Sequence, residues 1–161
     1  AHLALAEMEK EGRSITLVTQ NIDGLHQEAG SSSVIELHGT TRRFHCMDCS
    51  KGYSMDLAFQ MSEETNPPVC SECEGILRPD VIFFGESLDP HILQQAYQAG
   101  DSCDFLLVVG SSLVVYPAAD IPIRAKQGGA VLTIVNKEDT PLDYLADFLI
   151  HEEAGSILPK L

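Results

Sequence analysis

The stretch FLLVVGSS, residues 105–112, decides the fold. Its five consecutive apolar residues are typical of a strand that is buried on both faces within a parallel sheet. Runs of the same character are ITLVT (15–19), VIEL (34–37), VLTIV (131–135) and DFLI (147–150). Because helical patterns separate these runs, the sequence predicts an α/β fold, in which a parallel sheet is covered by helices on both faces.

Four helices are expected between and around the strands, at 2–10, 90–99, 117–127 and 153–160. Pro90 and Pro117 are suited to first helical turns, because a residue there needs no hydrogen-bonded N–H. Helix C-termini are expected at the glycines, since glycine readily adopts the left-handed conformation found there. These glycines are Gly12, Gly100, Gly128 and Gly129.

Polar residues follow four of the predicted strands. In order along the chain they are Gln20-Asn21-Ile22-Asp23-Gly24, His38-Gly39, Gly110-Ser111-Ser112 and Asn136. Open parallel sheets bind ligands beyond the carboxyl ends of their strands, so we expect these residues to form a site for a nucleotide-shaped polar ligand. Simpler interpretations stay open: His38 as a structural histidine, Gly-Ser-Ser as an ordinary turn, and Asn21 and Asp23 as local caps.

Two Cys-x-x-Cys pairs, Cys46/Cys49 and Cys70/Cys73, are separated by 20 residues. This spacing is typical of a tetrahedral zinc site. Four thiolates fill the coordination sphere, so the zinc is expected to be structural and to take no part in catalysis. Two disulfides, or four buried apolar residues, are the alternatives.

Both pairs lie in a polar stretch that interrupts the alternation of strands and helices. We therefore predict a zinc-binding module at residues 40–78, inserted into a sheet domain formed by residues 1–39 and 79–161.

Charge and composition narrow the possible partners. The chain has 24 acidic and 10 basic side chains, a net charge of −14. Nucleic-acid affinity depends on Lys and Arg, so no nucleic-acid partner is expected, whereas a basic peptide would be attracted. No apolar run approaches the roughly 20 residues that cross a bilayer, so no membrane partner is expected. Nothing resembles a signal peptide, which favours a cytoplasmic location with free thiols. The oligomeric state is left open.

The chain resembles the sirtuin family, the NAD-dependent protein-lysine deacylases, over nearly its whole length. Besides the Cys pairs, the matching segments are TQNIDGLHQEAG (19–30), VIELHG (34–39), RPDVIFFGE (78–86), GSSLVVYPAA (110–119) and VNKEDTP (135–141). The short zinc module is more similar to bacterial members. The resemblance implies a Rossmann-like NAD-binding domain with an inserted zinc module, and implies NAD as co-substrate and one structural Zn²⁺.

The resemblance also implies roles for individual residues. His38 matches the catalytic base, and the four cysteines match the zinc ligands. Residues that match NAD-binding positions are Gln20, Asn21, Ile22, Asp23, Gly110, Ser111, Ser112, Asn136, Lys137, Glu138 and Ala154. Residues that match substrate-binding positions are Phe84, Gly85, Glu86, Val114 and Tyr116. Phe83 or Phe84 is expected to line the acyl-lysine tunnel, with core packing as the alternative.

The implied reaction transfers an acyl group from a protein or peptide acetyl-lysine to ADP-ribose and releases nicotinamide. An imidazole suits the base that activates the ribose hydroxyl, because its pKa lies near neutral pH. The peptide is expected to bind by strand addition. Two alternatives stay open: ADP-ribosyl transfer from the same NAD site, and a catalytically weak, zinc-stabilised interaction module.

One family segment has no counterpart. The amino-terminal Gly-rich nucleotide loop does not occur in residues 1–161. The chain therefore resembles a fragment of a sirtuin. We expect residues 1–161 alone to bind NAD weakly, because the donors to the pyrophosphate normally come from such a loop.

Overall fold

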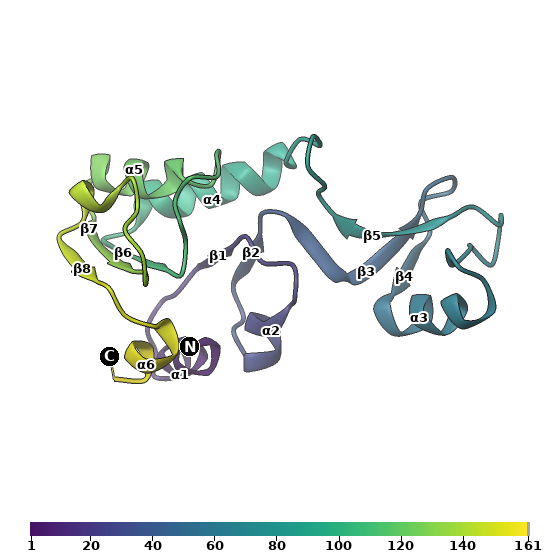
Figure 1. Ribbon diagram of the computed structural model, residues 1–161, viewed down its shortest axis with the longest axis horizontal. Coiled ribbons are helices and arrows are strands. Elements are labelled where there is room, and N and C mark those ends of the chain that lie inside the picture. The colour runs from purple at the N-terminus through teal and green to yellow at the C-terminus, as the bar shows by residue number, and fades with distance from the viewer. Residues whose placement is uncertain (161) are drawn as a thin grey trace.

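The computed structural model describes residues 1–160 and has two ends of different architecture (Figure 1). One end contains parallel strands and most of the helices, and the other contains an antiparallel sheet with one helix. Leu161, the last residue of the predicted 79–161 segment, lies outside the described residues. Within residues 1–160 no helix combines the length and the apolar character needed to cross a bilayer.

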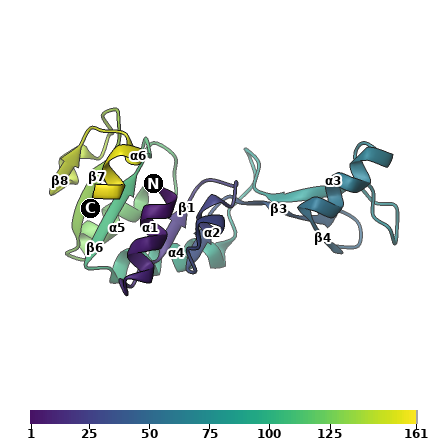
Figure 2. The same ribbon diagram turned by 90° about the horizontal axis from the view of Figure 1, so that it is seen from below.

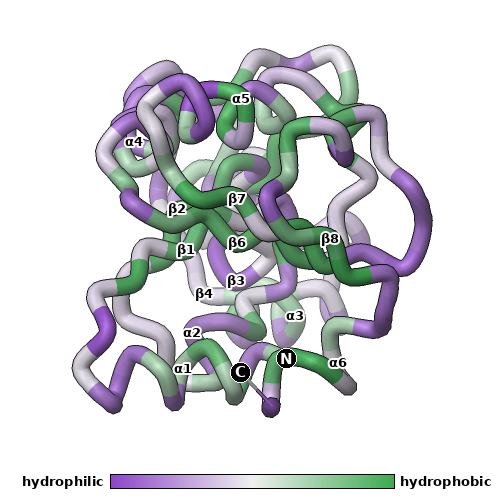
Figure 3. Tube along the Cα trace, turned by 90° about the vertical axis from the view of Figure 1, so that its left-hand side faces the viewer, coloured by the Kyte–Doolittle hydropathy of each residue, from purple (hydrophilic) through white to green (hydrophobic). Residues whose placement is uncertain are grey.

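The parallel strands form two ladders. β1 (Leu17–Thr19) pairs with β2 (Val34–Glu36), and β7 (Val131–Val135) lies between β6 (Phe105–Val109) and β8 (Phe148–Ile150). Each strand falls within a predicted apolar run, and the parallel pairing is confirmed. The run in β7 is continuous because its side chains are enclosed: Leu132, Ile134 and Val135 have no solvent exposure. Figure 3 shows these strands as a hydrophobic layer through the middle of this end.

Helices lie on both sides of this strand layer, as predicted (Figures 1 and 3). α4 (Pro90–Ser102) and α5 (Asp120–Gln127) lie on one side and pack against each other. α1 (His2–Lys10), α2 (Leu25–Ala29) and α6 (Ala154–Ile157) lie on the other. Two 3₁₀ helices, η1 (Asp143–Leu145) and η2 (Leu158–Lys160), complete this end. The arrangement is the Rossmann-like architecture expected from the sequence.

Three predicted helices differ from the structure. The helix predicted at 153–160 is divided into α6 and the 3₁₀ helix η2, and the bounds of α4 and α5 also differ. α5 begins at Asp120 rather than Pro117, because Pro117 belongs to a turn in which the Asp120 N–H donates to its carbonyl at 3.1 Å. α4 continues through Gly100 to Ser102 instead of ending there. Gly100 is buried, and a Cβ at this position would lie 3.1 Å from Ile121 Cγ2. The glycine at position 100 therefore allows α4 to pack closely on α5. Pro90 occupies the first turn of α4, as predicted.

The opposite end is an antiparallel sheet of β3 (Gly39–Cys46), β4 (Gly52–Ser54) and β5 (Leu77–Val81), with α3 (Met55–Glu64) beside it (Figure 2). None of these elements was predicted from the sequence. β3 is the central strand, and its pairing with β5 shifts register between Thr40 and Phe44. A small core joins the sheet to α3 and contains two of the paired cysteines, Cys46 and Cys70. β3 and β5 run across the boundaries predicted at residues 40 and 78, so they connect the two ends.

Candidate functional site: a four-cysteine cluster and a polar rim

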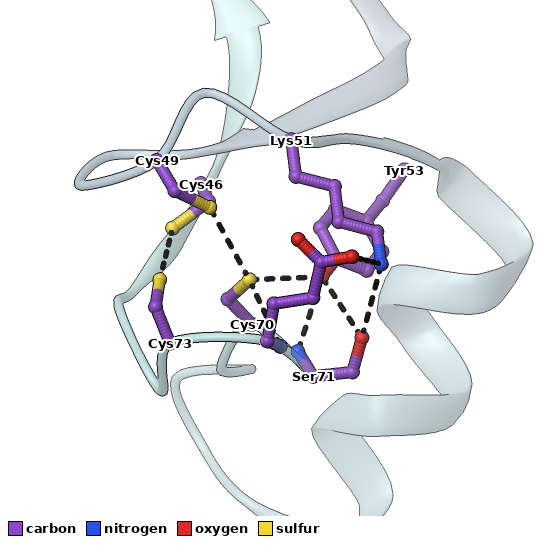
Figure 4. Close-up of polar contacts among 8 residues, drawn as sticks. Cys46, Cys49, Lys51, Tyr53, Cys70, Ser71 and Cys73 are labelled. Atoms are coloured by element: carbon purple, nitrogen blue, oxygen red, sulfur yellow. Dashed lines mark hydrogen bonds and ion pairs between the residues drawn. The ribbon is translucent and has the colours of Figure 1, made fainter.

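The four paired cysteines lie together near Cys46, the last residue of β3 (Figure 4). Their sulfur atoms are all within 4.8 Å of one another. Cys46 Sγ lies 3.4 Å from Cys73 Sγ, and Cys49 Sγ lies 3.6 Å from Cys70 Sγ, with no disulfide formed. Tetrahedral zinc with bonds of about 2.3 Å requires sulfur separations of about 3.8 Å. The cluster therefore fits one tetrahedral metal ion, and the disulfide alternative is wrong for this structure.

Each Cys-x-x-Cys pair is built by the same backbone pattern. The amides of Asp48 and Glu72 each donate to the sulfur of the cysteine two residues earlier, at 3.4 Å. The amides of Ser50 and Glu74 each donate at 3.0 Å to the carbonyl oxygen of that same cysteine. Ser50 and Glu74 both have φ of 60°. Two equivalent tight turns thus present the sulfurs to one point, which is the geometry that the two-residue spacing predicted.

A buried tyrosine supports the second pair. Tyr53 Oη lies 3.0 Å from Cys70 Sγ and accepts the Ser71 N–H at 3.0 Å. The hydroxyl hydrogen bond from Tyr53 lowers the pKa of Cys70 to about 6. A backbone hydrogen bond at Cys49 lowers the pKa of Cys46. Contacts with the neighbouring sulfurs and burial raise the pKa of Cys49 and Cys73, so only two of the four thiols are disposed to the thiolate form that zinc requires. Nothing in the sequence distinguished Tyr53 from an ordinary core residue.

Gly75 allows the two turns to approach. A Cβ at this position would lie 2.8 Å from Cys46 Sγ and would overlap the Asp48 carboxylate. The absence of a side chain at residue 75 is therefore a requirement of the cluster.

A second group of side chains lies at the carboxyl ends of the parallel strands. His38 follows β2, and its Nδ1 lies 3.0 Å from the carbonyl oxygen of Gln20, which follows β1. A carbonyl only accepts, so Nδ1 carries the hydrogen and Nε2 has a free lone pair. His38 is partly buried. The contact gives the imidazole the tautomer and fixed orientation that a general base needs.

Gly39 holds this arrangement against the antiparallel sheet. Its φ is 75°, and a Cβ there would overlap the carbonyl oxygen of Asp80. The Ile82 N–H donates to the His38 carbonyl at 3.0 Å. His38 is thus held by two hydrogen bonds, from its side chain to Gln20 after β1 and to its backbone carbonyl from Ile82 after β5.

The two parallel ladders meet at this rim. The Gln20 side-chain amide donates to Ser111 Oγ at 3.5 Å, which joins the residues after β1 to the turn after β6. Gly110 has φ of 60°, and a Cβ there would meet no atom within 4 Å. The backbone of this turn is therefore uncovered in the described residues, and ligand binding by Gly110, Ser111 and Ser112 stays a prediction.

The remaining rim residues make mainly local contacts. Asp23 Oδ1 accepts the Leu25 N–H at 3.0 Å at the start of α2, so the local-cap interpretation holds for this oxygen. Asn136 Nδ2 donates to the Glu138 carbonyl at 2.7 Å. Lys137 Nζ lies 3.2 Å from Glu153 Oε1, which joins the loop after β7 to the start of α6. Ala154 is the first residue of α6.

The loop after β5 is held by an ion pair that the sequence analysis did not single out. Arg78 donates to both oxygens of Glu86, at 3.0 and 2.9 Å, and the Phe83 N–H donates to Glu86 Oε2 at 2.9 Å. The arginine lowers the pKa of the Glu86 carboxyl, so this side chain is charged at neutral pH. Phe84 at the tip is fully exposed and Phe83 is half exposed. Neither aromatic ring is packed into a core within residues 1–160.

An open groove of about 620 Å³ lies beside this loop. Its lining residues are His45, Arg78, Asp80, Val81, Ile82, Glu86 and Ser87. Of the residues assigned from the resemblance, only Glu86 is among them. Val114 and Tyr116, the other substrate-binding candidates, are exposed on the segment that precedes α5.

The fold and these two groups of residues define a class of protein, in which a Rossmann-like α/β domain carries a four-cysteine module. The Sir2 family model matches residues 1–117. The chain belongs to the Sir2 family.

Similar proteins agree with this assignment. The chain is 47% identical over 160 residues to the NAD-dependent protein deacetylase of Sulfurisphaera tokodaii, covering 99% of this chain and 63% of that protein. It is 45% identical to the corresponding protein of Thermodesulfovibrio yellowstonii, covering all of this chain and again 63% of the relative. The chain thus spans about two thirds of the length of these curated relatives, a little under that share in each case.

Solved structures show the same fold. A structure of Sir2 with a p53 peptide and NAD⁺ superposes with a TM-score of 0.94 at 38% identity, covering 99% of this chain and 66% of that one. A structure of Sir2Tm bound to a propionylated peptide gives the same score and identity, covering 99% and 67%.

Proposed function

We propose that this chain supplies the catalytic base, much of the NAD site and the zinc module of an NAD-dependent protein-lysine deacetylase. The observation that carries the proposal is the His38 hydrogen bond to the Gln20 carbonyl. It leaves Nε2 as a proton acceptor at the carboxyl edge of the parallel strands, where this fold binds ligands. Relatives at 45 to 47% identity are NAD-dependent protein deacetylases, which supports the same reaction.

NAD fits the chemistry of the rim. Gln20 and Ser111 offer an amide and a hydroxyl in contact with each other, and the Gly110 turn offers open backbone. Asn136, Lys137 and Glu138 lie farther along the same edge, after β7, and Asn21, Ile22, Asp23, Ser112 and Ala154 complete the proposed set. When bound, NAD would supply the ADP-ribose that accepts the acyl group. His38 would accept a proton at Nε2, while the Gln20 carbonyl stabilises the positive charge that the ring then carries.

The four cysteines, Cys46, Cys49, Cys70 and Cys73, would hold one structural zinc. A complete thiolate shell leaves no position for substrate, so we assign this zinc no chemical step. We also retain residues 40–78 as the zinc module and residues 1–39 and 79–161 as the NAD-binding domain; the separate antiparallel sheet supports this division.

An acetyl-lysine peptide would bind next to the Phe84-Gly85-Glu86 loop. The groove beside this loop and the exposed aromatic rings provide surface for an extended chain, and Val114 and Tyr116 would contact it from the other side. The net charge of −14 favours lysine-rich substrates. Five cysteines without a disulfide are typical of a reducing compartment, which supports a cytoplasmic location.

The test uses the whole protein of which this chain is part. We expect His38→Ala to reduce deacetylation of an acetyl-lysine peptide by roughly 10²-fold or more, the usual scale for a general base. NAD binding, measured by calorimetry, should be retained. His91→Ala, an exposed histidine near the start of α4, is the matched control and should keep full activity.

Turnover of His38→Ala within a few-fold of the unmodified protein would refute the assignment of the base. Release of nicotinamide without deacetylated lysine would refute the proposed reaction and indicate ADP-ribosyl transfer instead.

A further inference from the structure

Three side chains of types that can bind a metal ion lie together at the far edge of the parallel strands, away from the cysteine cluster. Asp139 belongs to the loop after β7, Asp143 begins η1, and His151 directly follows β8. One ligand atom from each residue lies within 4.8 Å of the other two. His151 Nε2 is 3.5 Å from Asp139 Oδ1. Neither the zinc module nor the proposed reaction uses any of these residues.

The histidine of this cluster is held by its other ring nitrogen. His151 Nδ1 lies 3.3 Å from the carbonyl oxygen of Asn136. Because that carbonyl only accepts, Nδ1 carries the hydrogen, and the Nε2 lone pair faces the carboxylates. Histidines that bind metals almost always donate their second N–H to a carbonyl or carboxylate in this way. The backbone contact comes from outside the cluster and points the nitrogen lone pair into it.

The two carboxylates have complementary roles. Asp143 is partly buried, and its oxygens accept the Thr140 N–H at 3.0 Å and the Thr140 hydroxyl at 2.5 Å, so the carboxylate is fixed while each oxygen keeps a free lone pair. The Asp139 side chain is 96% exposed and free to rotate. A fixed ligand pair with one adjustable carboxylate is able to close on an ion.

The distances suit a first-row transition metal. Bonds of about 2.0 to 2.1 Å place tetrahedral ligands about 3.3 Å apart, close to the 3.5 Å between His151 and Asp139. The Asp139 side chain is almost fully exposed, so its carboxylate can rotate toward an ion held by His151 and Asp143. One imidazole with two carboxylates favours Zn²⁺, Co²⁺ or Ni²⁺, whereas Mg²⁺ and Ca²⁺ prefer oxygen alone.

We propose that Asp139, Asp143 and His151 form a second divalent-metal site, which binds Zn²⁺ or Co²⁺ with water completing the coordination. The site is independent of the four-cysteine cluster. A bound ion would tie the loop after β7 to the segment after β8. The proposal does not depend on the proposed enzymatic function.

The experiment uses the chain with its four-cysteine site already loaded with zinc. Calorimetric titration with Zn²⁺ should show one further ion bound per chain. His151→Gln and Asp139→Asn, both at exposed positions, should each weaken this second binding at least tenfold, whereas the controls His91→Gln and Glu152→Gln remove equivalent exposed groups and should leave it within twofold. Titration with Co²⁺ should broaden the amide NMR signals of residues 136–143 and 150–152 ahead of all others.

Two results would overturn the proposal. One is the absence of any binding beyond the first zinc. The other is second-ion binding that His151→Gln leaves unchanged, or Co²⁺ broadening centred on other residues, because the ion would then lie elsewhere on this acidic surface.

Discussion

Replacement of Gly39 by alanine tests the connection between the two ends of the molecule. The alanine would have to adopt a φ of 75°, and its Cβ would overlap the Asp80 carbonyl oxygen and lie 3.2 Å from Val81 Cα. The left-handed conformation costs about 1–2 kcal/mol for a residue with a Cβ. Overpacking against backbone adds about 1–3 kcal/mol. We therefore expect Gly39→Ala to lower the free energy of unfolding by about 2–5 kcal/mol.

Thermal unfolding followed by circular dichroism of the zinc-loaded chain measures this effect. For a chain of this length, each kcal/mol lowers Tm by about 2–4 °C, so Tm should fall by about 4–20 °C. Gly12→Ala is the matched control: its φ is 94°, but a Cβ there would meet no atom within 4 Å. It should show only the conformational cost, about 1–2 kcal/mol. If the two variants unfold within 2 °C of each other, the clash with Asp80 does not destabilise the fold as expected.

Three further predictions concern the zinc cluster and the loop after β5. Cys46→Ala should abolish zinc binding and unfold residues 40–78, because the free energy of binding to a four-thiolate site is largely free energy of folding. Metal analysis and amide NMR measure these two effects. A variant that is folded and metal-free but loses only activity would contradict the prediction. Gly75→Ala, which places a Cβ 2.8 Å from Cys46 Sγ, should release zinc to a chelator faster than the control Gly52→Ala, where a Cβ meets nothing within 4 Å. Arg78→Lys should lose the paired contact with Glu86, speed amide hydrogen exchange at Phe83 and raise the KM for peptide with little change in kcat. Because Arg78 lowers the pKa of Glu86, this ion pair should stabilise the folded chain fully at pH values above the ordinary carboxyl pKa. The stabilisation should be lost as the pH falls through the lowered pKa of Glu86. The variant Arg78→Met should show no such pH dependence.

Local sequence was sufficient for the parallel strands but not for the antiparallel sheet. The runs around β6 and β7 predicted strands correctly because a strand enclosed on both faces must be apolar throughout, as Leu132 and Ile134 are. β3, β4 and β5 carry mixed polar residues, and no apolar alternation marks them. Their order depends on contacts between distant residues, such as Tyr53 with Cys70, which no window of local sequence contains.

Glycine and proline were the least reliable boundary signals. Gly100 resembles a helix end, but its role is set by Ile121 on a neighbouring helix. Pro117 resembles a helix start, but the preceding turn contains it. Both outcomes reflect tertiary packing, which overrides local preference.

The cysteine spacing predicted that the four sulfurs lie together, since two residues between ligands suit the tight turn, but it did not predict the support from Tyr53. For His38 the sequence predicted a place at the strand ends, but the contact that orients the ring is with a backbone carbonyl. Every residue has a backbone carbonyl, so the sequence does not show which carbonyl accepts the His38 N–H. The tautomer of His38 is therefore known only from the structure. Which rim residues touch NAD stays a prediction.

The length of β3 has a mechanical consequence. Eight residues at about 3.4 Å each make a ribbon about 27 Å long, which carries the cysteine cluster near one end and Gly39 at the other. A tilt of only about 10° at Gly39, next to the register shift between Thr40 and Phe44, would swing the far end by about 5 Å. A change of angle beside His38 would therefore displace the cysteine cluster, at the far end of β3, much more than it displaces Gly39.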